Sequence, residues 1–123
     1  MVDTYITDKN GQSVLASGAT VPSDRNFRGA WVLNGNVISE DIDTAKEIFK
    51  DKIREVRAPL LEAEDVVYMK ALEADNSAAK AASVATKNAL RDATDDSAIA
   101  DATTITELKA AWDTDTLGDS PYA

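Results

Sequence analysis

Residues 41–74 read DIDTAKEIFKDKIREVRAPLLEAEDVVYMKALEA, and apolar side chains recur through them every three or four positions. This spacing places the apolar side chains on one side of an α-helix, which has 3.6 residues per turn. The apolar line consists of Ala45, Phe49, Ile53, Val56, Leu60, Ala63, Val67 and Ala71. Acidic residues favour the start of a helix, so Asp41 or Asp43 is the expected cap.

Pro59 interrupts this helical pattern. Proline has no backbone N–H and its ring clashes with the preceding turn, so it breaks or kinks a helix. We therefore expect one helix over residues 43–57 and another over residues 59–74, with Pro59 in the first turn of the second. A single kinked helix is the alternative.

Residues 1–40 show a different pattern, in which short runs of β-prone residues flank turn formers. Two of the turns are Asn-Gly pairs, Asn10-Gly11 and Asn34-Gly35. Glycine and asparagine accept the positive φ angles that tight hairpin turns require. The sequence therefore predicts two antiparallel β-hairpins, joined by a connector over residues 17–24 that is rich in turn-forming residues.

Two further helices are expected after residue 74. An alanine-rich helix over residues 75–91 has Asn76 or Ser77 as its cap. Thr104 and Glu107 then have the spacing of a capping box at the start of a short helix.

The expected fold class is therefore α+β, with N-terminal antiparallel β-hairpins followed by a C-terminal helical region of three to four helices. We place the β-hairpin region in residues 1–40, the helical region in residues 41–112 and a flexible acidic tail in residues 113–123. Trp112 is the expected anchor of the last helix.

Composition excludes several functional classes. The 123 residues include no cysteine and no histidine, which removes disulfides, thiolate nucleophiles and imidazole-based catalysis or metal binding. The net charge is −9 and the basic residues are interspersed with acidic ones, so neither nucleic-acid nor membrane binding is expected. No basic leader precedes an apolar run and no apolar run could span a bilayer, so we expect a cytoplasmic location.

Alanine makes up 21 of the residues, so few side chains can fill a core. Because buried apolar area drives folding, a core this thin indicates help from a partner. A monomer of marginal stability is the equal alternative.

Two clusters of acidic residues are candidates for a catalytic or metal-binding site. Glu62, Glu64 and Asp65 point in different directions around a helix, which favours a solvated helix face over a catalytic or metal-binding group. The aspartates around position 95 lack the glycine and glutamate of an EF-hand loop, so we interpret them as helix caps. We expect no catalytic residue, no metal ligand and no cofactor.

The remaining candidates are residues that contact a protein partner. Hairpins offer strand edges, and aromatic and aliphatic side chains supply most of the binding energy of protein interfaces. Burial of the same side chains in the core is the alternative. The candidates are Tyr5, Phe27, Trp31, Val32 and Val37 in the β region, and Phe49, Ile53 and Leu60 in the helical region.

Several stretches together resemble the small proteins of tailed bacteriophages that are encoded beside tail-fibre genes and described as tail fibre assembly proteins or tail assembly chaperones. The similarity spans about residues 20–112 and consists of ordinary residues without a catalytic signature. It is carried by PSDRNFRGAW (22–31), DTAKEI (43–48), KIREVRAPLL (52–61), YMKALE (68–73), KNALRD (87–92) and LKAAW (108–112).

This resemblance implies a non-enzymatic protein that helps a tail fibre or baseplate protein fold, assemble or attach. It implies a location in the host cytoplasm during assembly, with retention in the virion tail left open. The alternatives are a permanent structural subunit of the fibre or baseplate and, less favoured, a carboxylate- or metal-dependent enzyme. A homo-oligomer and several copies on a trimeric fibre are both compatible with this implied role.

Overall fold

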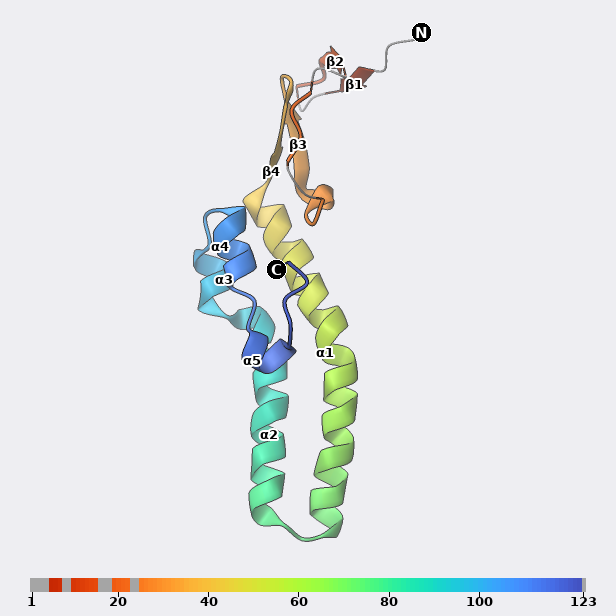
Figure 1. Cartoon of the computed structure of the whole chain (residues 1–123), viewed down its shortest axis with the longest axis vertical. Coiled ribbons are helices and arrows are strands. Elements are labelled where there is room, and N and C mark those ends of the chain that lie inside the picture. The colour runs from red at the N-terminus through yellow and green to blue at the C-terminus, as the bar shows by residue number, and fades with distance from the viewer. Residues whose placement is uncertain (1–4, 8–9, 16–18, 23–24, 123) are drawn as a thin grey trace. The chain divides into compact units, whose positions relative to one another are not determined.

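The structure is a computed structural model that describes residues 5–7, 10–15, 19–22 and 25–122. The chain divides into two compact units, Met1–Ile48 and Phe49–Ala123, and each is described by itself. Two antiparallel hairpins come first and helices follow (Figure 1), so the predicted α+β fold class is confirmed.

The first unit contains both predicted hairpins. Strand β1 (Tyr5–Thr7) pairs with β2 (Ser13–Leu15), and β3 (Trp31–Asn34) pairs with β4 (Val37–Glu40). Gly35 has a φ of 62°, which glycine adopts without steric cost and which the two-residue turn between β3 and β4 requires. The two turn residues are Gly35 and Asn36, since Asn34 ends β3 and lies opposite Val37, so the turn begins one residue later than the expected Asn34-Gly35 loop.

The connector before the second hairpin adds a contact that the sequence did not predict. The amide of Thr20 donates to the carbonyl of Asn36 at 2.6 Å, and the amide of Ile38 donates to the carbonyl of Thr20 at 2.7 Å. These bonds form a parallel bridge between Thr20 and Val37 along the outer edge of β4. In the same unit, the short 3-10 helix η2 (Arg28–Ala30) leads into β3, and Phe27 just before it is buried.

One continuous helix, α1 (Ile42–Glu73), replaces the two helices expected on either side of Pro59. The expected break after residue 57 is therefore wrong: Pro59 lies inside α1 with its side chain exposed. The helical pattern on both sides of the proline outweighs the loss of a single backbone hydrogen bond. Asp41 provides the cap, because its carboxylate accepts from the amide of Thr44 at 3.0 Å and from its hydroxyl at 2.6 Å. These bonds lower the pKa of Asp41.

Helix α2 (Ser77–Asp92) begins where the sequence predicted, and the side chain of Asn76 accepts from the amide of Ala79 at 3.0 Å. It runs antiparallel to the second half of α1, and a short turn joins the two helices (Figure 1). The segment of α1 from Phe49 to Glu73, the turn and α2 are called the helical hairpin below.

Three short helices complete the second unit: α3 (Ser97–Asp101), α4 (Ile105–Ala110) and α5 (Thr114–Leu117). The 3-10 helix η3 (Ala93–Asp95) links α2 to α3. The predicted cap of α4 is confirmed, since the hydroxyl of Thr104 accepts from the amide of Glu107 at 3.2 Å. The Glu107 carboxylate accepts from the amide of Thr103 at 2.7 Å, and this bond lowers the pKa of Glu107.

An aromatic cluster lies in the core of the second unit. The ring of Phe49 lies 5.8 Å from that of Trp112 and 5.5 Å from that of Tyr122, and the last two rings are 5.9 Å apart. The indole N–H of Trp112 donates to the carbonyl of Gly118 at 3.1 Å. Where the sequence suggested a flexible tail over residues 113–123, the structure has helix α5 and a tyrosine packed on the core. The aromatic contacts and the hydrogen bond from Trp112 to Gly118 attach this segment to the core.

The position of Tyr122 predicts how stability depends on alkaline pH. Burial, with a smaller contribution from the charge of Glu55, raises the pKa of Tyr122 to about 12 from its ordinary value of 10.0. Because the unfolded chain loses this proton first, the contribution to stability is complete below pH 10 and is lost as the pH rises towards 12. We therefore expect the free energy of unfolding of the wild type to fall more steeply over this range than that of Tyr122→Phe.

This difference is measured by urea denaturation at a series of pH values. Phenylalanine keeps the ring packed against Phe49, so the variant differs in the ionisable hydroxyl. Equal slopes for the two proteins would show that Tyr122 does not titrate with folding.

Candidate protein-binding surface

The structure separates the eight predicted contact residues by their exposure. Phe27, Phe49 and Ile53 are buried, with at most 1% of their surface exposed. These three side chains belong to the cores of their units, so a partner could reach them only if they left the core. This outcome follows the alternative that the sequence left open, in which large apolar side chains fill the interior.

The other candidates lie nearer the surface. Val37 is 48% exposed and Leu60 is 37% exposed. Trp31 and Val32 are half-buried, and the indole Nε1 of Trp31 is itself buried. The Tyr5 side chain lies outside the described part of the structure, although its backbone belongs to β1. Val37 and Leu60 belong to different units, so they are not combined into one site.

Residues of the two acidic clusters bind other parts of the chain and do not converge on one site. Asp65 pairs with Lys87 at 2.6 Å, and Glu64 uses its backbone carbonyl to accept from Ser83 at 3.4 Å. Asp96 caps α3 by accepting from the amide of Ala98 at 3.0 Å, as the capping interpretation expected. Within the described ranges, no group of three or more acidic side chains is arranged to hold a metal ion.

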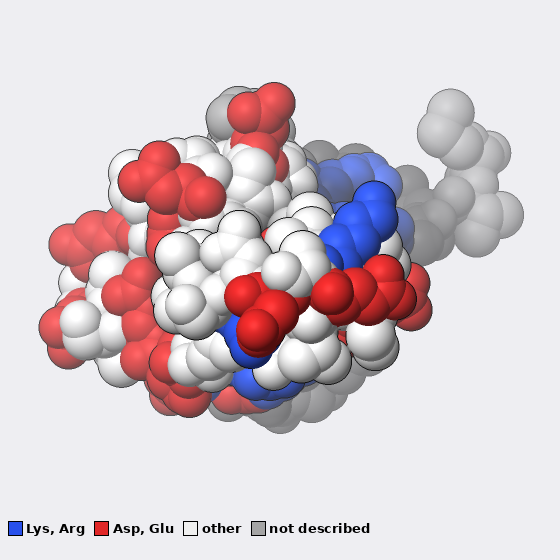
Figure 2. Space-filling model, turned by 90° about the horizontal axis from the view of Figure 1, so that it is seen from below, with Lys and Arg blue, Asp and Glu red and all other residues white. Residues whose placement is uncertain are grey.

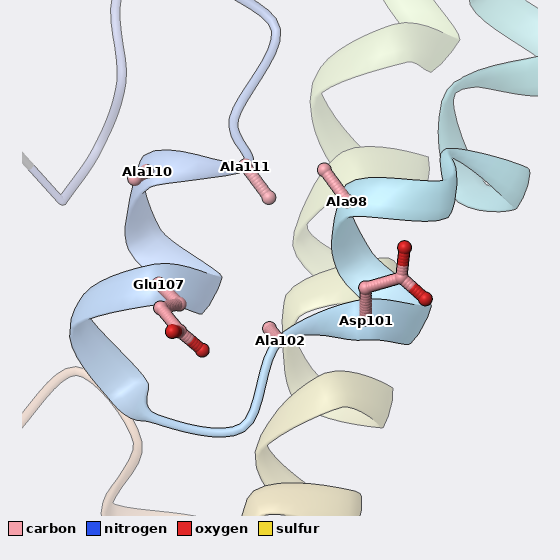
Figure 3. A pocket seen from close by; sticks show the side chains of 6 residues that line it. All are labelled: Ala98, Asp101, Ala102, Glu107, Ala110 and Ala111. Atoms are coloured by element: carbon pink, nitrogen blue, oxygen red, sulfur yellow. The ribbon is translucent and has the colours of Figure 1, made fainter.

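A pocket of about 330 Å³ lies between α3 and α4 (Figure 3). Four of its six lining residues are alanines, and the other two are Asp101 and Glu107. The Glu107 carboxylate is already bonded to the amide and hydroxyl of Thr103. The pocket therefore offers methyl groups and one uncommitted carboxylate, which is too little to define a catalytic or ligand-binding site.

Several polar side chains connect α1 and α2. The guanidinium of Arg57 donates to the carbonyls of Leu90 and Arg91, at 3.4 and 3.0 Å. The ammonium group of Lys87 lies 4.7 Å from the ring centre of Tyr68, close enough for a cation–π contact. Small side chains complete the contact, because Ala71 and Ser83 are both buried. Helix α2 thus covers the side of α1 that carries Arg57, Tyr68 and Ala71.

The second half of α1 also carries several large apolar side chains that remain about half exposed. They contrast with the first half, where Phe49 and Ile53 on the same predicted apolar line are buried. The exposed residues are Leu60, Val66, Val67, Met69 and Leu72.

Part of this exposed surface is hollowed. A groove of about 430 Å³ is lined by Asp65, Val66, Met69, Lys70 and Glu73. Val66 is 55% exposed and Met69 is 53% exposed. The surface viewed from the turn end of the helical hairpin has uncharged areas bordered mainly by acidic side chains (Figure 2). The groove residues together with Glu62 are called the Val66/Met69 face below.

Val66, Met69 and Leu72 are not part of the apolar line identified in the sequence and are not among the predicted contact residues. The available signal was the helical spacing, which places Val66 and Met69 on the side of α1 opposite Tyr68 and Ala71.

Comparison with protein-family models, with curated proteins and with solved structures found no match. None of the helices in the described residues combines the length and apolar character that crossing a bilayer requires.

Proposed function

We propose that this chain is a non-enzymatic protein that binds a bacteriophage tail fibre or baseplate protein and assists its folding, assembly or attachment. The resemblance of residues 20–112 to tail fibre assembly proteins supplies the kind of partner. The observation that carries a binding role is the exposure of large apolar side chains along the second half of α1.

Clustered exposed apolar side chains favour protein association because covering them removes apolar surface from water. An unassembled fibre chain presents unpaired edges and apolar surface of its own. A complex would cover both surfaces at once, which is the physical basis of an assembly factor. Binding would take place in the host cytoplasm, where fibres assemble.

The alternative is a permanent structural subunit of the fibre or baseplate. The extensively packed C-terminal segment, in which Trp112 and Tyr122 contact Phe49, favours a fold that persists after assembly. Quantitative mass spectrometry of purified particles distinguishes the two roles. A stoichiometric amount of the chain identifies a subunit, and its absence identifies a transient assembly factor.

The proposal is tested by co-expressing the chain with the product of the neighbouring fibre gene. We expect the two proteins to co-purify and the yield of soluble fibre to fall when the chain is omitted. A fibre protein that folds and assembles equally well alone, and that never co-purifies with this chain, would contradict the proposal.

A further inference from the structure

The Val66/Met69 face has an ordered arrangement of charge as well as apolar surface. Glu62, Val66, Met69 and Glu73 are separated by four, three and four positions, so they form one line along α1. The two apolar residues occupy the middle of this line, and a glutamate stands at each end. Lys70 is the one basic residue among those that define the face.

Apart from Lys70, the nearby basic residues Lys80 and Lys87 are already paired within the helical hairpin. Lys87 pairs with Asp65 at 2.6 Å, and Lys80 pairs with Asp75 at 3.6 Å. Glu62 and Glu73 have no ion-pair partner among the described residues. The face therefore carries an excess of uncompensated negative charge around an apolar centre.

This charge disfavours a second copy of the chain as the occupant. If two α1 helices packed in antiparallel orientation through this face, Glu62 of one would meet Glu73 of the other. A parallel arrangement would place each glutamate beside its own copy. Lys70 could approach Asp65 of the other copy, but that carboxylate already binds Lys87. Like charges opposite one another oppose association, so the matching partner is basic.

We propose that the Val66/Met69 face binds an amphipathic helix of the partner protein, whose apolar residues fill the groove and whose Lys or Arg residues flank them at both ends. A helix is the matching shape because it presents side chains at three- and four-residue spacing to a helical groove. Methionine suits such a contact because its flexible thioether adapts to different apolar side chains. This inference rests on the proposed function and adds the chemistry of the bound segment.

The test uses two synthetic helical peptides of about 18 residues, long enough for five turns. Both carry the same leucine pair, flanked by lysines in one peptide and by glutamates in the other. Fluorescence anisotropy at low salt should show that the wild type binds the lysine peptide at least about tenfold more tightly, a difference of about 1.4 kcal/mol. The double variant Glu62→Lys/Glu73→Lys should reverse the preference.

A matched control separates this face from the overall charge of the protein. Asp95→Lys/Asp119→Lys makes the same change in net charge at two exposed positions elsewhere, and it should keep the preference for the lysine peptide. Val66→Ser/Met69→Ser should weaken binding of the lysine peptide at least about tenfold, because the apolar centre is lost. Circular dichroism confirms that each variant is folded.

The inference is overturned if the wild type binds neither peptide, if Glu62→Lys/Glu73→Lys keeps the original preference, or if sedimentation shows that the wild type dimerises through this face. A fibre complex that still forms in co-expression would then leave the proposed function standing. Absence of that complex would instead contradict the proposed function, whatever the peptides show.

Discussion

Replacing Phe49 with alanine should lower the free energy of unfolding by about 3–5 kcal/mol, the usual cost of removing a buried aromatic side chain. Phe49 is fully buried and its ring contacts both Trp112 and Tyr122. Its removal leaves a cavity between the start of the helical hairpin and the C-terminal segment. No neighbouring backbone can close this cavity easily, because Phe49 lies within the long helix α1.

Urea denaturation followed by circular dichroism measures this effect, with Val66→Ala as the control. Val66 lies on the same helix but is 55% exposed, so its truncation should change stability by less than about 1 kcal/mol. A loss no greater for Phe49→Ala than for the control would contradict the aromatic core described above.

Replacing Pro59 with alanine should raise the free energy of unfolding by about 2–3 kcal/mol, since proline in a helix interior costs about 3 kcal/mol relative to alanine. Pro59 lies in the middle of α1, and its side chain is exposed, so alanine there removes no core contact. The substitution also restores an N–H that can donate within the helix. Thermal and urea denaturation both measure the gain.

Ala63→Pro is the matched control, because it places a proline at another exposed position of α1 one turn further along. It should destabilise by an amount similar to the gain from Pro59→Ala. A Pro59→Ala variant that is less stable than the wild type would show that a break at residue 59 belongs to the native structure, as the two-helix prediction held.

These two residues show why parts of the fold could be predicted from the sequence and others could not. The second hairpin and the Asn76 and Thr104 caps depend on neighbouring residues alone, and the structure confirms all three, with the hairpin turn at Gly35-Asn36 instead of Asn34-Gly35. At Pro59 the local rule favours a break, but helical residues on both sides maintain the helix. The order of the tail depends on a contact between Tyr122 and Phe49, which are far apart in the sequence.

The sequence indicated that apolar residues would contact a partner, but it did not identify most of the apolar residues that are exposed on α1. A shortage of bulky residues indicated association with a partner, and Leu60 was among the residues selected. Periodicity alone does not determine which residues of an apolar line are covered. Along α1, Phe49 and Ile53 are buried, and the Phe49 ring contacts Trp112 and Tyr122, whereas Val67 is 49% exposed. That difference depends on which other parts of the chain pack against each position of the helix.

Met69 offers the most direct measurement of partner binding through α1. It is 53% exposed in the free chain and is the only methionine besides Met1, so its oxidation by hydrogen peroxide reports on this surface without any mutation. Mass spectrometry should show that Met69 oxidises at least about tenfold more slowly in the complex with the fibre protein than in the free chain, because the partner covers the thioether. A complex in which Met69 oxidises as fast as in the free chain would contradict binding through this surface.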